Sequence, residues 1–327
     1  MSTKSGYGSY DKTMSSEVVS PIGQLSVAMA TPFKADGSLD VDSAVKLARH
    51  LVDTGVDSIL ISGTTGEAPT TYQPEKDELT RAVIEEVGEE AYIMAGAGSN
   101  DTAHAVRMAV SAEACGADGL LVVSPYYNRP NQKGLRAHVE AIIEATSLPI
   151  TLYDIPGRTG LAFSDETLDY LAQNDRIVAV KDATGNPNQA LERMERTGLA
   201  YYSGDDALNY LFMAGGASGI VSVVGHVAGP YFRKAIEAIN EGRFEEARDI
   251  HRQMRPLIDA IMGGGQGAVM AKVAVHLQGV IESDAVRLPL VQADSEDVDR
   301  LRKIMEELEK LRKEKVVSEY KAKFLGL

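Results

Sequence analysis

Residues 55–61, Gly-Val-Asp-Ser-Ile-Leu-Ile, form a short unit that recurs along the chain. The same succession appears as Gly-Ala-Asp-Gly-Leu-Leu-Val at 116–122 and as Gly-Ala-Ser-Gly-Ile-Val-Ser at 216–222. In each copy, a glycine that can end a helix precedes a tight turn and a short apolar run typical of a buried strand. Repetition of this unit favours a closed βα barrel.

The chain around these units alternates short apolar runs with longer segments of helical periodicity. Eight apolar runs are predicted to be strands: Leu25–Pro32, Ser58–Gly63, Ala91–Gly96, Gly119–Ser124, Pro149–Ile155, Ile177–Lys181, Ala200–Gly204 and Gly219–Gly225. The predicted fold is therefore α/β, a (β/α)8 TIM barrel. A doubly wound open sheet is the weaker alternative, because no G-x-G-x-x-G motif follows the first strand.

The sequence after the eighth predicted strand reads as helical throughout. Helices are predicted over 226–241, 244–262, 268–278 and about 297–323. The glycine-rich run 263–267 is interpreted as a flexible linker, because no Lys-Ser/Thr follows it as in a P-loop. We predict a flexible N-terminal arm over residues 1–20, the barrel over 21–227 and a C-terminal helical appendage over 228–327.

The charge balance of the 327 residues is acidic, with 33 Lys and Arg against 47 Asp and Glu. A net charge of −14 repels the phosphate backbone, so we expect no nucleic-acid partner. No apolar run reaches about 18 residues, so we expect no membrane span. The one cysteine, Cys115, fits a reducing compartment, and residues 1–20 lack an apolar secretion segment. We therefore expect a cytoplasmic location.

Lys181 is the most informative polar residue, because the loops that follow barrel strands carry catalytic groups. It ends the apolar run 177–180, where an ammonium is costly and desolvation lowers its pKa. An amine held in this way can attack a ketone and form an imine. The alternative is a structural lysine paired with a carboxylate such as Asp182, and the position alone leaves both readings open.

Two tyrosines and two threonines also follow apolar runs. Tyr153 and Tyr127 carry hydroxyls that can relay protons with a threonine hydroxyl, although either tyrosine alone is better explained by packing. Thr64 and Thr65 precede Gly66 in a turn whose backbone N–H groups suit a small carboxylate. Ordinary turn chemistry is the alternative for this segment.

Charged residues at other strand ends are less specific. Arg158 can bind a second carboxylate with its planar guanidinium, or it is a surface arginine. Asp205 and Asp206 are adjacent, so they point to opposite faces of a strand, and one of them is expected to cap a helix. The six histidines show no metal-ligand spacing, so we expect no metal site.

Five motifs, taken together, identify a resemblance. They are Gly-Thr-Thr-Gly-Glu at 63–67, Pro-Tyr-Tyr-Asn-Arg-Pro at 125–130, Tyr-x-x-Pro-x-Arg-Thr-Gly at 153–160, Val-Lys-Asp-Ala-Thr-Gly at 180–185 and Ser-Gly-Asp-Asp-Ala at 203–207. In this order they resemble the 4-hydroxy-tetrahydrodipicolinate synthases (dihydrodipicolinate synthases), within the pyruvate-dependent Schiff-base lyase family. The resemblance runs from about Gly23 to about Leu311.

The resemblance implies a reaction and its catalytic residues. Pyruvate and L-aspartate 4-semialdehyde would condense through a Schiff base on Lys181, in the diaminopimelate and lysine pathway. Tyr153, Thr64 and Tyr127 would form a proton relay, with Tyr127 contributed by a neighbouring subunit. The family implies a homotetramer, built as a dimer of dimers, and no external cofactor, because the lysine itself supplies the electron sink.

The resemblance also implies the substrate-binding residues. Thr65 would bind the pyruvate carboxylate, Arg158 the carboxylate of the semialdehyde, and Gly204 and Val221 would line the pocket. Sialic acid lyases of the same family carry Gly-Ser-Thr-Gly-Glu and lack the arginine, so Thr64 and Arg158 favour the synthase. Another pyruvate-dependent aldolase and a non-catalytic keto-acid-binding barrel remain the alternatives.

Two places depart from the pattern of the relatives. Many have Asn where Asp154 stands, and this position is not expected to touch the chemistry. Lysine-inhibited relatives carry a histidine and a glutamate where Gln73 and His104 stand here. Although Tyr126 and Asn100 remain, we predict weak or absent feedback by lysine.

Overall fold

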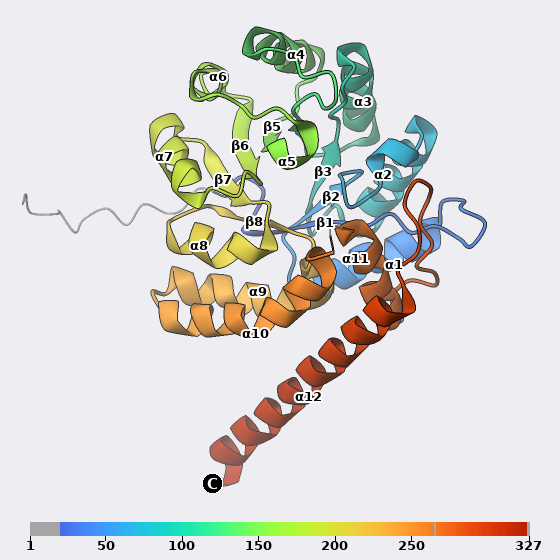
Figure 1. Cartoon of the computed structure of the whole chain (residues 1–327), viewed down its shortest axis with the longest axis vertical. Coiled ribbons are helices and arrows are strands. Elements are labelled where there is room, and N and C mark those ends of the chain that lie inside the picture. The colour runs from blue at the N-terminus through green and yellow to red at the C-terminus, as the bar shows by residue number, and fades with distance from the viewer. Residues whose placement is uncertain (1–19, 265, 326–327) are drawn as a thin grey trace, which may run out of the picture.

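The computed structural model describes residues 20–264 and 266–325, with side chains up to residue 311. Eight parallel strands close in sequence order into a barrel (Figure 1). The strands are β1 (Leu25–Ala28), β2 (Ser58–Ile61), β3 (Tyr92–Gly96), β4 (Gly119–Val123), β5 (Ile150–Asp154), β6 (Ile177–Asp182), β7 (Ala200–Ser203) and β8 (Gly219–Ser222). The predicted TIM barrel is confirmed. The predicted arm over residues 1–20 lies outside the described residues except for Ser20.

Helices surround the barrel and extend it at the C-terminal end. Those before β8 are α1 (Val41–Asp53), α2 (Gln73–Val87), α3 (Thr102–Cys115), α4 (Gln132–Ala145), α5 (Pro156–Thr159), α6 (Asp165–Leu171), α7 (Pro187–Thr197) and α8 (Asn209–Ala214), with short 3-10 turns η1 (Ala68–Thr70) and η2 (Asp206–Leu208). Those after β8 are α9 (Gly225–Asn240), α10 (Phe244–Met262), α11 (Gly267–Leu277) and α12 (Ser295–Leu325). The predicted boundary at 227 falls inside the first turn of α9, and the predicted linker joins α10 to α11, with Gly265 outside the described residues.

The recurring unit forms the helix-to-strand junction that its sequence predicts. Gly55, Gly116 and Gly216 have φ angles of 91°, 90° and 97°, in the left-handed region that glycine adopts without strain. The aspartate of the first unit, Asp57, accepts hydrogen bonds from Gln24 N at 2.8 Å and Leu25 N at 2.9 Å. Each junction therefore ends a helix and starts a strand, and in this first copy it also fixes the start of β1.

Most predicted strands are too long at their carboxyl ends. β1 ends at Ala28 rather than Pro32, and β8 ends at Ser222 because α9 already begins at Gly225. The apolar residues beyond these strands are buried in loops, which periodicity cannot distinguish from buried strands. β3 and β6 are the exceptions: β3 ends at Gly96 as predicted, and β6 continues through Lys181 to Asp182.

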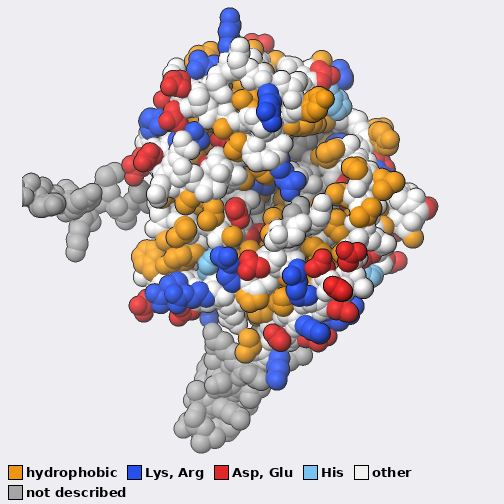
Figure 2. Space-filling view, viewed as in Figure 1, with side chains coloured by type: hydrophobic (Ala, Val, Ile, Leu, Met, Phe, Trp, Pro, Cys, Tyr) orange, Lys and Arg blue, Asp and Glu red, His pale blue; other side chains and the backbone are white. Residues whose placement is uncertain are grey.

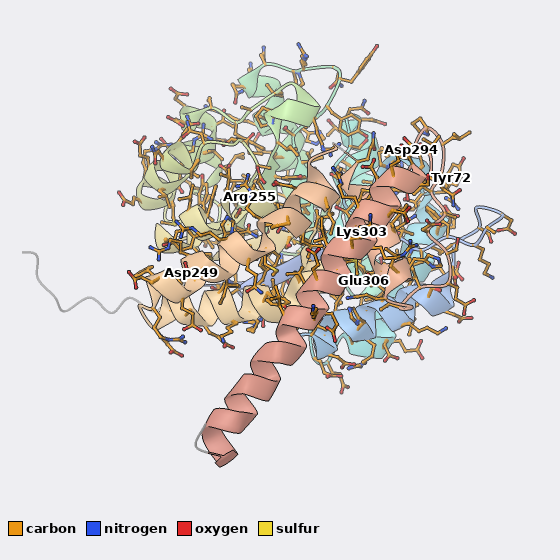
Figure 3. All side chains as sticks on the ribbon, turned by 60° about the horizontal axis from the view of Figure 1, so that its bottom comes forward. Tyr72, Asp249, Arg255, Asp294, Lys303 and Glu306 are labelled. Atoms are coloured by element: carbon orange, nitrogen blue, oxygen red, sulfur yellow. The ribbon has the colours of Figure 1, made fainter. Side chains whose placement is uncertain are left out.

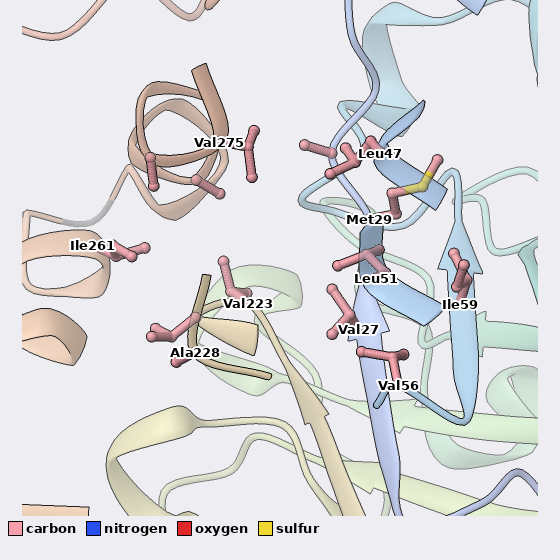
Figure 4. Close-up of a cluster of buried hydrophobic side chains, with 14 of the residues drawn as sticks. Val27, Met29, Leu47, Leu51, Val56, Ile59, Val223, Ala228, Ile261 and Val275 are labelled. Carbon is pink, nitrogen blue, oxygen red and sulfur yellow. The ribbon is translucent and has the colours of Figure 1, made fainter. Parts of the chain in front are cut away.

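The hydrophobic core has two layers, one inside the barrel and one between barrel and helices. The inner layer contains Leu60, Met94, Leu121, Tyr202 and Val221. The outer layer continues into the C-terminal helices: Figure 4 shows Val223 between Ile261 of α10 on one side and Val27 and Leu51 on the other, with Val275 of α11 above it. The C-terminal helical appendage is therefore packed onto the barrel through shared apolar contacts.

The last helix leaves the body of the molecule. Leu301 of α12 is fully buried in the outer core, but the helix then continues past Lys303 and Glu306 and projects beyond the other helices (Figure 3). Among the described residues, no helix combines the length and the apolar character needed to cross a bilayer. Basic and acidic side chains are interspersed on the face drawn in Figure 2.

Candidate active site

Lys181 and Tyr153 lie side by side inside the barrel. They are register partners on β6 and β5, and their side chains are 4% and 5% exposed. The Nζ of Lys181 lies 4.4 Å from the centroid of the Tyr153 ring. Asp182, the next residue, points away from the barrel interior and accepts hydrogen bonds from Thr184 N at 3.0 Å and Thr184 Oγ1 at 2.8 Å. The alternative of a Lys181–Asp182 pair is therefore wrong.

Burial changes the protonation of Lys181. Desolvation lowers the pKa of its ammonium to about 8, with Arg158 lowering it further and Asp206 raising it. At pH 7 a pKa of about 8 leaves roughly a tenth of the side chains as free amine, against roughly four in ten thousand at the ordinary pKa of about 10.4. The barrel thus supplies the uncharged amine that imine formation requires.

Tyr153 is held in its protonated form. Desolvation raises the pKa of its phenol to about 12, although Arg158 and a hydrogen bond with Thr64 act in the opposite direction. The Thr64 side chain is exposed, so the pair Tyr153–Thr64 connects the buried Lys181 region to the surface of the turn. Such a pair can pass a proton in either direction, because each hydroxyl is both donor and acceptor.

The turn that carries Thr64 and Thr65 has a strained, tightly packed backbone. Ser62 and Glu67 have φ angles of 55° and 53°, which residues other than glycine rarely adopt. A Cβ on Gly66 would lie 3.0 Å from Met29 O, so this backbone leaves no room for a side chain there. Strain of this kind persists only where neighbouring structure enforces it.

A buried ionic network around Glu67 holds the turn that carries Thr64 and Thr65 in its strained conformation. The Glu67 carboxylate forms a salt bridge with the Lys272 ammonium of α11 and accepts Arg287 N at 3.0 Å. The Lys272 and Glu67 side chains are 0% and 1% exposed. Lys272 also donates to Ala285 O at 2.8 Å, and its Nζ lies 4.1 Å from the Phe33 ring centroid. The C-terminal appendage therefore anchors the threonine turn, a role that no local motif indicated.

Gly204 lies beside Lys181, and Val221 lies in the same cluster as Tyr153. A Cβ on Gly204 would stand 3.1 Å from Cγ and Cε of Lys181, so only glycine leaves that side chain its space. Val221 is 1% exposed and packs in the same inner cluster as Tyr153. Both residues therefore border the region around the Lys181 amine.

The two adjacent aspartates have separate roles. Asp205 accepts Ala207 N at 3.0 Å and so caps η2, which confirms the predicted cap for one of the pair. Asp206 is fully buried and accepts Val223 N at 2.9 Å and Val224 N at 2.8 Å. Among its charged neighbours, Asp206 has the largest influence on the Lys181 pKa, which it raises. No local motif indicated this contribution, because it depends on β6, β7 and β8 being neighbours.

Two predicted residues lie at the surface of the chain. Arg158 is exposed on α5 but is close enough to Lys181 and Tyr153 to lower both pKa values. Tyr127 is 90% exposed and has a φ of 72°, and Asn128 beside it donates to Asn100 O at 2.7 Å. The structure therefore groups Lys181, Tyr153, Thr64, Arg158, Gly204 and Val221, and leaves Tyr127 projecting outward.

A large cavity lies elsewhere. It has a volume of about 820 Å³ and is bordered by α1, α9, α10, α11 and α12, with His50, Tyr231 and Met305 in its lining. None of the predicted site residues lines it. In the described part of the chain, no group of His, Cys, Asp or Glu side chains is arranged to hold a metal ion.

The chain is similar to known proteins in both sequence and fold. The sequence pattern of the dihydrodipicolinate synthetase family matches residues 21–308. A 4-hydroxy-tetrahydrodipicolinate synthase of Kineococcus radiotolerans is 49% identical over 86% of this chain and 91% of its own length. A 4-hydroxy-tetrahydrodipicolinate synthase 2 of Streptomyces coelicolor is 48% identical over 86% and 94%. The crystal structure of the Cyanidioschyzon merolae enzyme with lysine bound superposes with a TM-score of 0.83 at 39% identity, covering 87% of this chain and 97% of that one.

Proposed function

The chain belongs to the dihydrodipicolinate synthetase family, and from this premise we propose how its own residues carry out the family's condensation. The enzyme is a Schiff-base lyase that joins pyruvate to L-aspartate 4-semialdehyde and forms 4-hydroxy-tetrahydrodipicolinate, in diaminopimelate and lysine biosynthesis. The observation that carries the proposal is the buried Lys181 amine beside the Tyr153 ring.

Lys181 is the nucleophile of the proposed mechanism. Its free amine attacks the keto carbon of pyruvate, and loss of water gives an imine. The protonated imine withdraws electrons, so the pyruvate methyl group loses a proton and an enamine forms. The enamine carbon bonds to the aldehyde carbon of the second substrate, whose oxygen takes up a proton. The amino group of that substrate then attacks the imine carbon, closes the ring and releases Lys181 as the free amine.

Tyr153 moves the protons of these steps. Its phenol remains protonated at neutral pH because burial raises its pKa to about 12, so it can donate to the oxygen that leaves as water. The hydrogen bond to Thr64 lets a proton pass on toward the exposed turn. We assign the pyruvate carboxylate to the backbone N–H groups of the turn that carries Thr65. Arg158 is assigned to the carboxylate of the semialdehyde.

Tyr127 belongs to the site of a neighbouring copy in this proposal. A tyrosine that is 90% exposed with a φ of 72° has strain and apolar surface that its own chain does not compensate. Insertion into a two-fold related copy would bury the ring and complete the relay of Tyr153 and Thr64. We propose a homotetramer formed as a dimer of dimers, with two such reciprocal sites in each tight dimer.

Mixed dimers test the shared site. Lys181→Ala and Tyr127→Phe subunits are each expected to be inactive or nearly so as homodimers. Unfolded and refolded together, they should recover up to about a quarter of wild-type activity, since half of random dimers are hybrids and each hybrid has one intact site. No recovery in demonstrably mixed dimers would show that Tyr127 acts within its own chain or not at all.

Substrate profiling separates the proposed reaction from its alternatives. With pyruvate present, L-aspartate 4-semialdehyde should be consumed faster than other aldehydes, whereas another aldolase of the family would prefer a different acceptor. A keto-acid-binding barrel without turnover would bind pyruvate and consume no aldehyde. We propose a cytoplasmic location, supported by the buried free thiol of Cys115 and by the pathway of the relatives.

A further inference from the structure

Behind Tyr153 and Lys181, on the outer face of the same strands, lie two buried carboxyl groups that the proposed mechanism does not use. Asp154 follows Tyr153 on β5, and Asp182 follows Lys181 on β6; their side chains are 0% and 1% exposed. The two aspartates are register partners, as Tyr153 and Lys181 are. Partners on neighbouring strands are about 4.8 Å apart and point to the same side of the sheet. The carboxyl groups therefore face the same small volume.

The hydrogen bonds around this volume are incomplete. Oδ1 of Asp154, Oδ2 of Asp182 and the hydroxyl of Tyr201 on β7 have no hydrogen-bond partner among the described residues. The other carboxyl oxygen of each aspartate does have a partner: Arg193 Nη1 lies 3.3 Å from Asp154 Oδ2, and Thr184 donates twice to Asp182 Oδ1. Buried polar atoms are almost always paired. The Tyr201 hydroxyl can donate to one of the two unpaired carboxyl oxygens, which still leaves the other oxygen without a proton donor.

The charges facing this pair leave one carboxylate without a counterion. Among the described residues, Arg193 of α7 is the cation that forms an ion pair with this pair of aspartates, and it also binds Asp165 of α6 at 2.8 Å and Phe163 O at 3.0 Å. Arg196 of α7 reaches Asp165 at 3.4 Å, and β7 contributes the neutral phenol of Tyr201. Two ionised aspartates in this setting would share one arginine that is already engaged, a costly arrangement in a low dielectric.

We infer that Asp154 and Asp182 share one proton, and that the resulting carboxyl–carboxylate hydrogen bond holds the ends of β5 and β6 together behind Tyr153 and Lys181. Each aspartate is thus a positioning residue for the catalytic residue that precedes it. The titration behaviour agrees with this arrangement: burial first, and then Asp182, raise the pKa of Asp154 to about 7, while Arg193 lowers it. Burial also raises the pKa of Asp182.

The pH dependence of stability distinguishes a shared proton from two ionised groups. The folded protein keeps this proton up to the raised pKa, whereas the unfolded chain loses it near the ordinary value of about 3.9. The pair therefore contributes its full stabilisation below the pKa that the carboxyl has in the unfolded chain. This contribution is lost as the pH rises toward the pKa of the carboxyl in the folded protein. The unfolding equilibrium constant of the wild type should rise ~10-fold per pH unit from 5 to 7 relative to Asp154→Asn, and the difference should level off above about 7.

Matched variants make this measurement specific. Asp154→Asn keeps an N–H donor toward Asp182 but cannot titrate, and Asp182→Asn does the same in reverse, so either variant should reduce the slope. Asp165→Asn is the control: its carboxyl is 46% exposed and its pKa is lowered by Arg193, so the slope should remain. Asp154→Leu should destabilise at every pH, because it removes the donor and the partner of Arg193. All variants are compared in the oligomeric state that the wild type adopts.

A second readout tests the positioning role and rests on the proposed function of Lys181. The rate at which pyruvate and borohydride label Lys181 should be similar in wild type and Asp154→Asn at pH 6, and ~2-fold or more higher in the variant at pH 8. A wild-type stability curve parallel to that of Asp154→Asn would overturn the shared proton. If stability shows the expected dependence on pH but the ratio of labelling rates between variant and wild type is the same at pH 6 and pH 8, the positioning role alone is overturned. Absence of any labelling would instead count against the proposed function.

Discussion

The Nζ of Lys181 lies 4.4 Å from the centroid of the Tyr153 ring, and the two residues are register partners on the neighbouring strands β6 and β5. The barrel therefore places an amine and a phenol at fixed separation in a space that water scarcely reaches. That burial lowers the pKa of the amine and raises that of the phenol, so near neutral pH part of the Lys181 population is free amine while Tyr153 stays protonated.

The rate of imine formation should follow the ionisation of Lys181. Because only the free amine attacks, kcat/KM for pyruvate should rise ~10-fold per pH unit below about 8 and level off above it. Asp206 raises this pKa, so Asp206→Asn should move the midpoint to lower pH. Asp249→Asn, whose carboxylate is 65% exposed on α10, is the control and should leave the midpoint in place. A midpoint that moves upward in Asp206→Asn would contradict the electrostatic assignment.

Gly204 should tolerate no side chain. A methyl group there would meet Cγ and Cε of Lys181 at 3.1 Å and also Asp182 O at 3.1 Å, so Gly204→Ala must displace the lysine. A displacement of this kind lowers kcat/KM by up to ~100-fold. Gly264→Ala, where nothing lies within 4 Å of the added carbon, is the matched control. Steady-state kinetics with pyruvate measure kcat/KM in both variants, and equal values would show that the lysine adjusts freely.

The Glu67–Lys272 salt bridge should matter for both stability and pyruvate binding. Glu67→Gln leaves a buried ammonium without its anion, which costs ~3–5 kcal/mol of unfolding free energy, and Glu67→Gln with Lys272→Met should recover much of that loss. Because the turn carrying Thr65 loses its anchor, KM for pyruvate should rise in the single variant. Arg49→Met, which breaks a more exposed cluster with Glu86 and Glu90, should cost ~1 kcal/mol or less. A double variant less stable than Glu67→Gln would contradict this account.

Feedback by lysine is predicted to be weak or absent. In lysine-inhibited relatives the places of Gln73 and His104 hold a histidine and a glutamate, so the carboxylate that would attract a lysine ammonium is missing here. Lys76, one turn beyond Gln73 on α2, adds a cation whose Nζ donates to Ala68 O at 2.9 Å and Thr71 O at 2.6 Å. Initial rates should hardly change when L-lysine is added, and strong inhibition at sub-millimolar lysine would disprove the prediction. His104→Glu is expected to increase sensitivity.

The sequence predicted the barrel and most of the site because both depend on local patterns. The eight apolar runs predicted the strand count, the glycine-led units favoured a closed barrel, and Lys181 and Tyr153 could be placed because they end apolar runs. Asp206 and Lys272 could not be placed, since their partners come from strands and helices far away in the chain. The same holds for Asp154 and Asp182, whose pairing depends on the register between β5 and β6.

Trapping of the Schiff base tests the central claim most directly. Enzyme, pyruvate and borohydride are incubated together, the protein is digested, and the peptides are analysed by mass spectrometry. We predict one reduced pyruvate adduct per subunit, on Lys181, and none on Lys181→Ala, which should remain folded. An adduct on another lysine, or full synthase activity in Lys181→Ala, would contradict the account.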